Sequence, residues 1–102
     1  MATKIIDLSA FIGYEGKNVS MKEPTGTDML AVTDFMNRDK KSNGGEPNML
    51  KASIYLLSLI IKDAPFATDV NSLSNLPFKL LNYLADEAGE LISPLPKKNE
   101  TV

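Results

Sequence analysis

Apolar and polar residues alternate in two short segments near the N-terminus. The sequences "KIIDL" at 4–8 and "NVSMK" at 18–22 both carry apolar side chains at strand-like spacing. Between them "GYEGK" supplies Gly13 and Gly16, which can adopt the positive φ of a tight turn. The pattern predicts an antiparallel hairpin or a pair of strands. Because two strands alone are only marginally stable, we expect helices to cover their apolar face.

The period changes at Pro24, which cannot donate a hydrogen bond to a strand ladder. Thr25 and Asp28 then stand at the spacing of a capping box, so a helix is predicted to begin near Gly26. Asp28 in its first turn also suits the positive end of the helix dipole. One stripe of this helix is apolar and consists of Met29, Val32, Phe35 and Met36. Leu30 lies off the stripe, either as an ordinary exposed leucine or as a contact for a partner.

Residues 37–47, "NRDKKSNGGEP", are polar and contain paired glycines, which predicts a loop. A second helix should follow, with Pro47 in its first turn and its end near Lys62. Around a narrow polar strip this helix is apolar at Met49, Leu50, Ile54, Leu56, Leu57, Leu59, Ile60 and Ile61. That is more apolar surface than one contact face needs, so the helix is either central in the domain or partly buried between subunits.

The last third of the chain predicts a short connection and a third long helix. A helical turn is expected after Thr68 or Asp69, and the long helix is expected to be capped by Ser74 or Asn75, with Gly89 at its C′ position. Its predicted buried side consists of Phe78, Leu81, Leu84, Ala85 and Ala88.

Together these elements predict the α+β class, with an N-terminal β-hairpin or strand pair packed on a bundle of three to four α-helices. The chain has 102 residues, enough for one core. We expect a single domain over 1–92 and a flexible C-terminal tail over 93–102, where two prolines and two lysines show no apolar period.

The amino-acid composition narrows the range of reactions and ligands that the chain could support. The chain contains no cysteine and no histidine, which excludes disulfides, thiol nucleophiles, histidine bases and nearly all zinc sites. The net charge is −2, and the one basic cluster, "RDKK" at 38–41, is too short for a duplex-binding surface. The most apolar run, 52–61, covers half of the ~20 residues that span a bilayer. We therefore expect no cofactor, no metal, no nucleic acid partner and no membrane insertion.

Two arrangements could carry catalysis. Carboxylates stand at helical neighbour spacing at Glu87 and Glu90, or at Asp86 and Glu90, and a serine–lysine pair could form a nucleophile. Such carboxylate pairs usually form a solvated face, and no partner residue accompanies them. The sequence therefore favours a binding protein over an enzyme.

The stretch "GKNVSMKEPTGTDML" at 16–30 combines a Gly-Lys turn, an alternating strand, a Lys-Glu-Pro-Thr junction and a helix that begins near Asp28-Met29. This order resembles the tail assembly chaperones of long-tailed bacteriophages, the family typified by phages lambda and HK97. Similarity extends more loosely through the apolar second helix, the connector "DVNSLSNLPF" and the final amphipathic helix. The specific part covers about fifteen residues.

The resemblance implies a non-catalytic protein of the host bacterial cytoplasm that binds the tape measure protein and helps recruit the major tail tube protein. It also implies self-association and absence from the mature virion. Family members often have a longer form made by translational frameshifting. If Pro96 is encoded CCA and Lys97 and Lys98 are encoded AAA AAG, the message would carry the slippery heptamer A AAA AAG just before Asn99. The candidate protein-contact residues are Leu30, Leu56, Leu57, Ile60, Ile61 and Leu95. A structural virion component, such as a tail completion or head-tail connector protein, remains the alternative.

Overall fold

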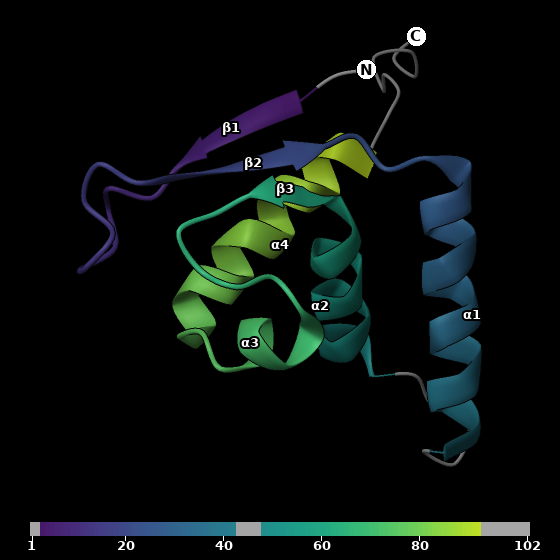
Figure 1. The fold of residues 1–102 in the computed structure, drawn as a ribbon. Coiled ribbons are helices and arrows are strands. Elements are labelled where there is room, and N and C mark those ends of the chain that lie inside the picture. Colours follow the sequence, from purple (N-terminus) through teal and green to yellow (C-terminus); the bar gives the residue numbers. More distant parts are fainter. Residues whose placement is uncertain (1–2, 43–47, 93–102) are drawn as a thin grey trace, which may run out of the picture.

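The computed structural model describes residues 3–42 and 48–92 of the chain (Figure 1). The predicted tail over 93–102 lies outside these residues. The described part forms a three-stranded antiparallel sheet packed with four helices, which confirms the predicted α+β class. Figure 1 shows the sheet above α2, α3 and α4, with α1 standing at one side.

The N-terminal hairpin forms as the alternating pattern predicts. Strand β1 (Thr3–Asp7) pairs antiparallel with β2 (Asn18–Lys22), and Ile5 lies opposite Ser20. In the connecting loop Gly13 and Gly16 adopt φ values of 92° and 76°. These values lie in the region that glycine occupies at little steric cost, so the two glycines permit the turn.

Helix α1 (Gly26–Ser42) begins where Pro24 and the capping residues predict, but it is longer than expected. The predicted loop over 37–47 is wrong as far as Ser42, and 43–47 lie outside the described residues. Asp39 explains part of the difference, because its Oδ2 accepts a hydrogen bond from Asn48 N at 2.8 Å. Its Oδ1 also lies 3.4 Å from Lys51 Nζ. These polar contacts hold the helix end against the next helix, and apolar periodicity cannot reveal them.

The second helix stops earlier than predicted, and a strand that the sequence did not reveal follows it. Helix α2 (Met49–Ile60) is capped by Asn48, and β3 (Ile61–Asp63) begins directly after it. Ile61 has φ −73° and ψ 122°, and its N–H donates to Leu57 O. Extended backbone at Ile61 is favoured because β3 pairs with β2, with Met21 opposite Ile61. A β-branched residue also fits a strand well.

The predicted turn near Asp69 is confirmed as α3 (Val70–Ser74). The carboxylate of Asp69 caps it and accepts a hydrogen bond from Ser72 N at 3.1 Å. Helix α4 (Phe78–Ile92) begins after Pro77, whose carbonyl accepts from Leu80 N and Leu81 N at 3.0 Å. The predicted cap at Ser74 or Asn75 is therefore two to three residues too early, since Pro77 directly precedes the helix.

Two further predictions about α4 are wrong. Gly89 lies inside the helix rather than at C′, because the helix continues to Ile92 and Leu91 packs against the core in that last turn. Phe78 was expected on the buried side but is 62% exposed, and Leu80 is fully buried instead. The buried face of α4 consists of Leu80, Leu81, Leu84 and Ala88.

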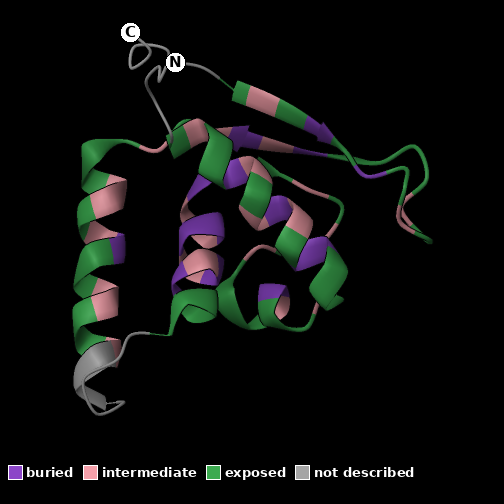
Figure 2. Cartoon of the chain, turned by 180° about the vertical axis from the view of Figure 1, so that it is seen from behind, coloured by how far each residue is buried: buried purple, intermediate pink, exposed green. Residues whose placement is uncertain are grey.

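Helix α2 occupies the centre of the molecule. Figure 2 shows buried residues gathered on α2, along α4 and on the strands, whereas α1 is mostly exposed or intermediate. The principal-axis extents are 41 × 40 × 22 Å, so the molecule is flat. This arrangement buries Ala52, Ile54, Leu56, Leu57 and Ile60 of α2 within one chain, whereas Met49 and Leu50 at the start of the helix stay exposed.

Candidate functional site

The structure separates the predicted contact residues into three groups. Leu56, Leu57, Ile60 and Ile61 are buried within the chain's own core. In this conformation Leu56, Ile60 and Ile61 are covered by the rest of the chain, whereas Leu57 also forms part of the floor of a groove between α2 and α4. Leu30 is 72% exposed on α1, and Leu95 lies outside the described residues.

The strand-to-helix junction is built from reciprocal hydrogen bonds. Asp28 N donates to Thr25 Oγ1 at 3.1 Å, and Thr25 N donates to Asp28 Oδ2 at 2.9 Å. The predicted capping box therefore forms, with a shorter aspartate in place of the usual glutamate. Lys22, the last residue of β2, also donates from Nζ to Asp28 Oδ2. One carboxylate thus joins the end of a strand to the start of a helix.

These contacts favour the charged form of Asp28. The Lys22 ammonium, and then the hydrogen bond from Thr25 N, hold the pKa of the Asp28 carboxyl below its usual range. The side chains of Lys22 and Asp28 are only 24% and 16% exposed, so the ion pair is shielded from much of the solvent. The junction is therefore a rigid, polar structural element.

An apolar groove lies between the first halves of α2 and α4. Its volume is about 330 Å³. The lining residues are Met49, Leu50, Ser53, Ile54 and Leu57 of α2 with Phe78, Leu81, Asn82 and Ala85 of α4. Two polar side chains, Ser53 and Asn82, accompany seven apolar ones, so the groove is suited to apolar contacts.

The groove has a buried floor and an exposed rim. Ile54, Leu57 and Leu81 form the floor and also belong to the core. On the rim Phe78, Met49 and Leu50 are 62%, 61% and 47% exposed. Isolated exposed apolar residues are ordinary in monomers, whereas several gathered around one groove mark an interaction site.

In the described part of the chain no charged side chain lines the groove, and two helix N-termini lie at one of its ends. Both α2 and α4 run toward the sheet, so their N-termini lie at the end of the groove away from it (Figure 1). Neither helix has an acidic residue in its first turn. Asn48 caps α2 by accepting from Lys51 N at 3.1 Å, but among the described residues no side chain caps α4. An exposed helix N-terminus is itself electropositive. Lys79, in the first turn of α4, does not line this groove but a separate cavity beside Phe11, Ile12 and Tyr14.

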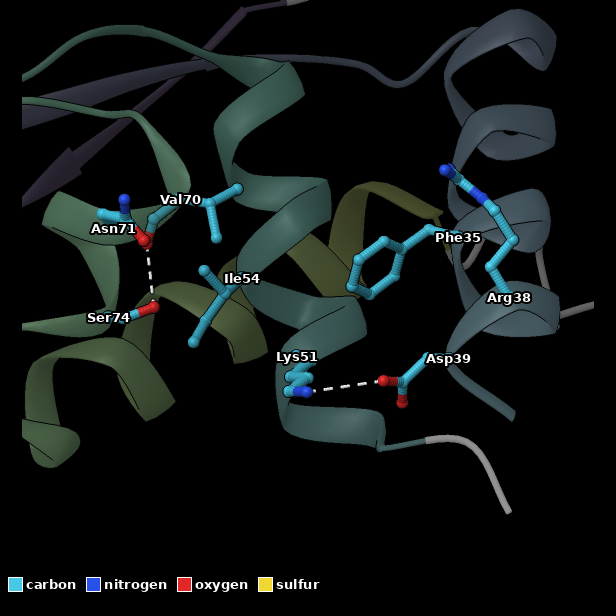
Figure 3. Close-up of a pocket in the computed structure, with 8 residues that line it drawn as sticks. All are labelled: Phe35, Arg38, Asp39, Lys51, Ile54, Val70, Asn71 and Ser74. Carbon is cyan, nitrogen blue, oxygen red and sulfur yellow. Dashed lines mark hydrogen bonds and ion pairs between the residues drawn. The ribbon is translucent and has the colours of Figure 1, made fainter. Parts of the chain in front are cut away.

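A second cavity of about 440 Å³ lies among α1, α2 and α3 (Figure 3). Its walls combine apolar and charged residues, including Phe35, Ile54, Val70 and Lys51. The charged groups are engaged in structural contacts, because Lys51 pairs with Asp39 and Arg38 Nε lies 3.5 Å from Asp34 Oδ2. This cavity is therefore interpreted as the space that remains where α1 packs against the rest of the domain.

The carboxylates of Glu87 and Glu90, considered above as a catalytic pair, instead bind a lysine of strand β1. Lys4 Nζ of β1 lies 2.6 Å from both Glu87 Oε1 and Glu90 Oε1. These hydrogen bonds, first that to Glu87 and then that to Glu90, raise the pKa of the Lys4 ammonium. The pair therefore neutralises a lysine and attaches β1 to α4. Within residues 3–42 and 48–92 no group of three or more acidic side chains could hold a metal ion.

Sequence reasoning missed the groove for a specific reason. It placed Phe78 on the buried side of its helix and could not say which part of the apolar surplus of α2 would stay exposed. The excess of apolar residues on the second helix was the available signal in the sequence for an exposed apolar surface, since Met49 and Leu50 belong to that excess. Only the placement of α4 beside α2 shows that these residues share one rim with Phe78.

Comparisons of the chain with models of known protein families, with curated proteins and with solved structures find no match. Among the described helices, none has the length and apolar character that crossing a bilayer requires. Function therefore has to be inferred from the residues and their arrangement.

Proposed function

We propose that this protein is a tail assembly chaperone of a long-tailed bacteriophage, which binds the tape measure protein and helps recruit tail tube subunits without catalysing a reaction. The observation that carries the proposal is the resemblance over residues 16–30, from the Gly-Lys turn through Lys22-Glu23-Pro24-Thr25 to Asp28-Met29.

The geometry of this stretch gives the resemblance a physical basis. Lys22, Thr25 and Asp28 form one hydrogen-bonded unit that fixes where the strand ends and the helix begins. The three residues of the motif therefore have roles that depend on their identities and spacing.

The groove between α2 and α4 supports a binding role. A chaperone of assembly must offer apolar surface to an incomplete partner, and the rim residues Met49, Leu50 and Phe78 offer such surface. The host bacterial cytoplasm is the proposed location, because tails assemble there before the finished particle is released. Self-association is part of the proposal as an expectation from the family resemblance.

Quantitative mass spectrometry of infected cells and of purified virions tests the proposal. We expect the chain to be abundant during tail assembly and absent from finished particles. Stoichiometric recovery from virions would contradict the chaperone role and support a tail completion or connector protein. Peptides that read through Pro96 and Lys97 into a longer product would add support for the family, because they would reveal the frameshifted form.

A further inference from the structure

We infer that the free edge of β1 pairs with β1 of a second copy of this chain, antiparallel and about a two-fold axis at Ile5, so that two three-stranded sheets join into one. The inference rests on the proposed function in that it assigns a surface to the self-association expected there. The geometry of the strand supplies the register.

Strand β1 lies at an edge of the sheet. The strand order is β1-β2-β3, and Figure 1 shows no other described element on the outer side of β1. An edge strand presents unpaired N–H and C=O groups along its outer side, so it can act as a template for another strand. Within residues 3–42 and 48–92 no strand pairs with this side of β1.

The hydrogen-bond pattern shows which residues face the free edge. Leu8 N donates to Lys17 O at 2.9 Å at the end of the ladder between β1 and β2. Because hydrogen-bonded pairs alternate along antiparallel strands, Ile6 and Lys4 also direct their backbone groups toward β2. The residues whose backbone groups point to the free edge are therefore Thr3, Ile5 and Asp7.

A two-fold axis at Ile5 matches the whole strand to itself. Ile5 would exchange both backbone hydrogen bonds with Ile5 of the second copy, and Thr3 would do so with Asp7 of the second copy at each end. Asp7 O already accepts a hydrogen bond from Tyr83 Oη at 3.2 Å, and its second lone pair serves the Thr3 N–H. All outward backbone groups of β1 are then paired.

The side chains on the uncovered face of the sheet also match. Ile5 is 63% exposed, because it alternates with the buried Ile6 and so points away from the helices. At the axis the two Ile5 side chains lie opposite each other and cover apolar surface that one chain leaves in water. At each end the Thr3 hydroxyl lies opposite an Asp7 carboxylate. Ser9 donates to Oδ1 of that carboxylate, which leaves Oδ2 for Thr3.

Charge and overlap disfavour the neighbouring registers. An axis at Lys4 would place two lysines directly opposite each other, and an axis at Asp7 would do so for two aspartates, both of which destabilise strand pairing. Axes at Thr3 or Ile6 would leave outward groups of β1 without a partner within the strand. With the axis at Ile5, Lys4 lies opposite an isoleucine and keeps both of its carboxylate partners on α4.

Other occupants fit this edge less well. The chain's own residues 93–102 contain Pro94 and Pro96, which have no N–H to donate to a ladder. A client strand would not share the match around Ile5, because that match requires the sequence of β1 on both sides of the axis.

Charged substitutions at the axis provide the test. A residue on a two-fold axis faces its own copy, so Ile5→Lys and Ile5→Glu should each bring like charges together, whereas a mixture of the two variants brings opposite charges together. Sedimentation velocity of the full chain from micromolar to millimolar concentration gives the dimer fraction, and thermal unfolding checks the fold. Leu30→Lys, which changes a comparably exposed residue on α1, is the matched control.

We expect a reversible dimer of the wild type that Leu30→Lys retains. Ile5→Lys and Ile5→Glu should each weaken it by at least about tenfold, and their equimolar mixture should recover that loss, because like charges across an interface repel and opposite charges attract. Amide hydrogen exchange of the wild type adds a measurement without substitution. The Ile5 N–H should exchange more slowly as the protein concentration rises, whereas the Ile6 N–H, already paired with β2, should change little.

A monomer at every concentration, a dimer that neither Ile5 substitution weakens, or a mixture no tighter than the separate variants would overturn the inference. An equal loss with Leu30→Lys would also overturn it, because the contact would then not be specific to β1. So would a monomer whose Ile5 N–H is already protected, since another segment of the chain would occupy the edge. These outcomes leave the chaperone role open, because recovery of the chain from virions decides that role.

Discussion

At the junction between β2 and α1 the polar groups are paired within the chain: Lys22 and Thr25 both donate to Asp28, and Asp28 N donates to Thr25. At the groove between α2 and α4, by contrast, Phe78 and Met49 leave most of their apolar surface in solvent. The junction satisfies its own hydrogen-bonding groups, so a role in folding is sufficient to account for the identities of its residues. Folding therefore removes little of the apolar surface of the groove rim from water.

This difference separates residues that keep the structure from residues available for binding. Burial stabilises a side chain in proportion to the apolar area removed from water, so an exposed rim contributes little to stability. Substitutions at the junction and in the groove floor should therefore act on folding, whereas substitutions at the rim should act on partners.

The largest expected effect is in the groove floor. Leu57 is 1% exposed and belongs to the core, so Leu57→Ala should lower the free energy of unfolding by about 2–5 kcal/mol. Urea denaturation followed by circular dichroism measures it. Leu30→Ala is the matched control and should change stability by no more than about 0.5 kcal/mol. A similar small effect for both would mean that the floor is not part of the core.

The junction should show the next largest effect. Asp28→Ala removes the cap of Thr25 N and the partner of Lys22, so we expect a loss of about 1–2 kcal/mol in the same measurement. Asp34→Ala serves as control, because Asp34 lies on the same helix in an exposed pair with Arg38. Its loss should not exceed about 0.5 kcal/mol. Equal losses would show that the junction is no more than an ordinary surface pair.

The stability contribution of Asp28 should also depend on pH. Its pKa is lower in the folded chain than the ordinary value of 3.8, so the folded state favours the charged form. The contribution is complete above that ordinary value and is lost as pH falls through the depressed pKa of the folded state. The stability difference between wild type and Asp28→Asn should therefore shrink in acid below pH 3.8. A difference that stays constant to the lowest accessible pH would contradict the ion pair.

The smallest effect on folding is expected at the groove rim. Phe78 is 62% exposed, so Phe78→Ser should lower the free energy of unfolding by less than about 1 kcal/mol. Thermal and urea unfolding measure this change. A loss as large as that of Leu57→Ala would place Phe78 in the core and remove the distinction between rim and floor.

Local signals in the sequence predicted the junction and the hairpin. Gly13, Gly16, Pro24, Thr25 and Asp28 act through their own backbone or on near neighbours, and the structure confirms the turn and the capping box that they predict. The α+β class followed from the same local patterns.

Features that depend on distant contacts could not be predicted in the same way. Strand β3 exists because β2 is available to pair with Ile61, and the last turns of α1 are held by Asp39 contacts with the start of α2. Helical periodicity assigned Ile61 to the preceding helix. Phe78 was placed on the wrong side of α4, because a hydrophobic stripe does not show which of its edges faces a neighbour.

Capture of the tape measure protein tests the central claim most directly. Affinity-tagged wild-type chain, Phe78→Ser and Leu30→Ser would each be produced together with the tape measure protein of the same phage, and the captured complexes would be quantified. We predict that wild type and Leu30→Ser retain the tape measure protein while the folded Phe78→Ser variant loses it. Failure of the folded wild-type chain to retain the tape measure protein would contradict the proposed chaperone function.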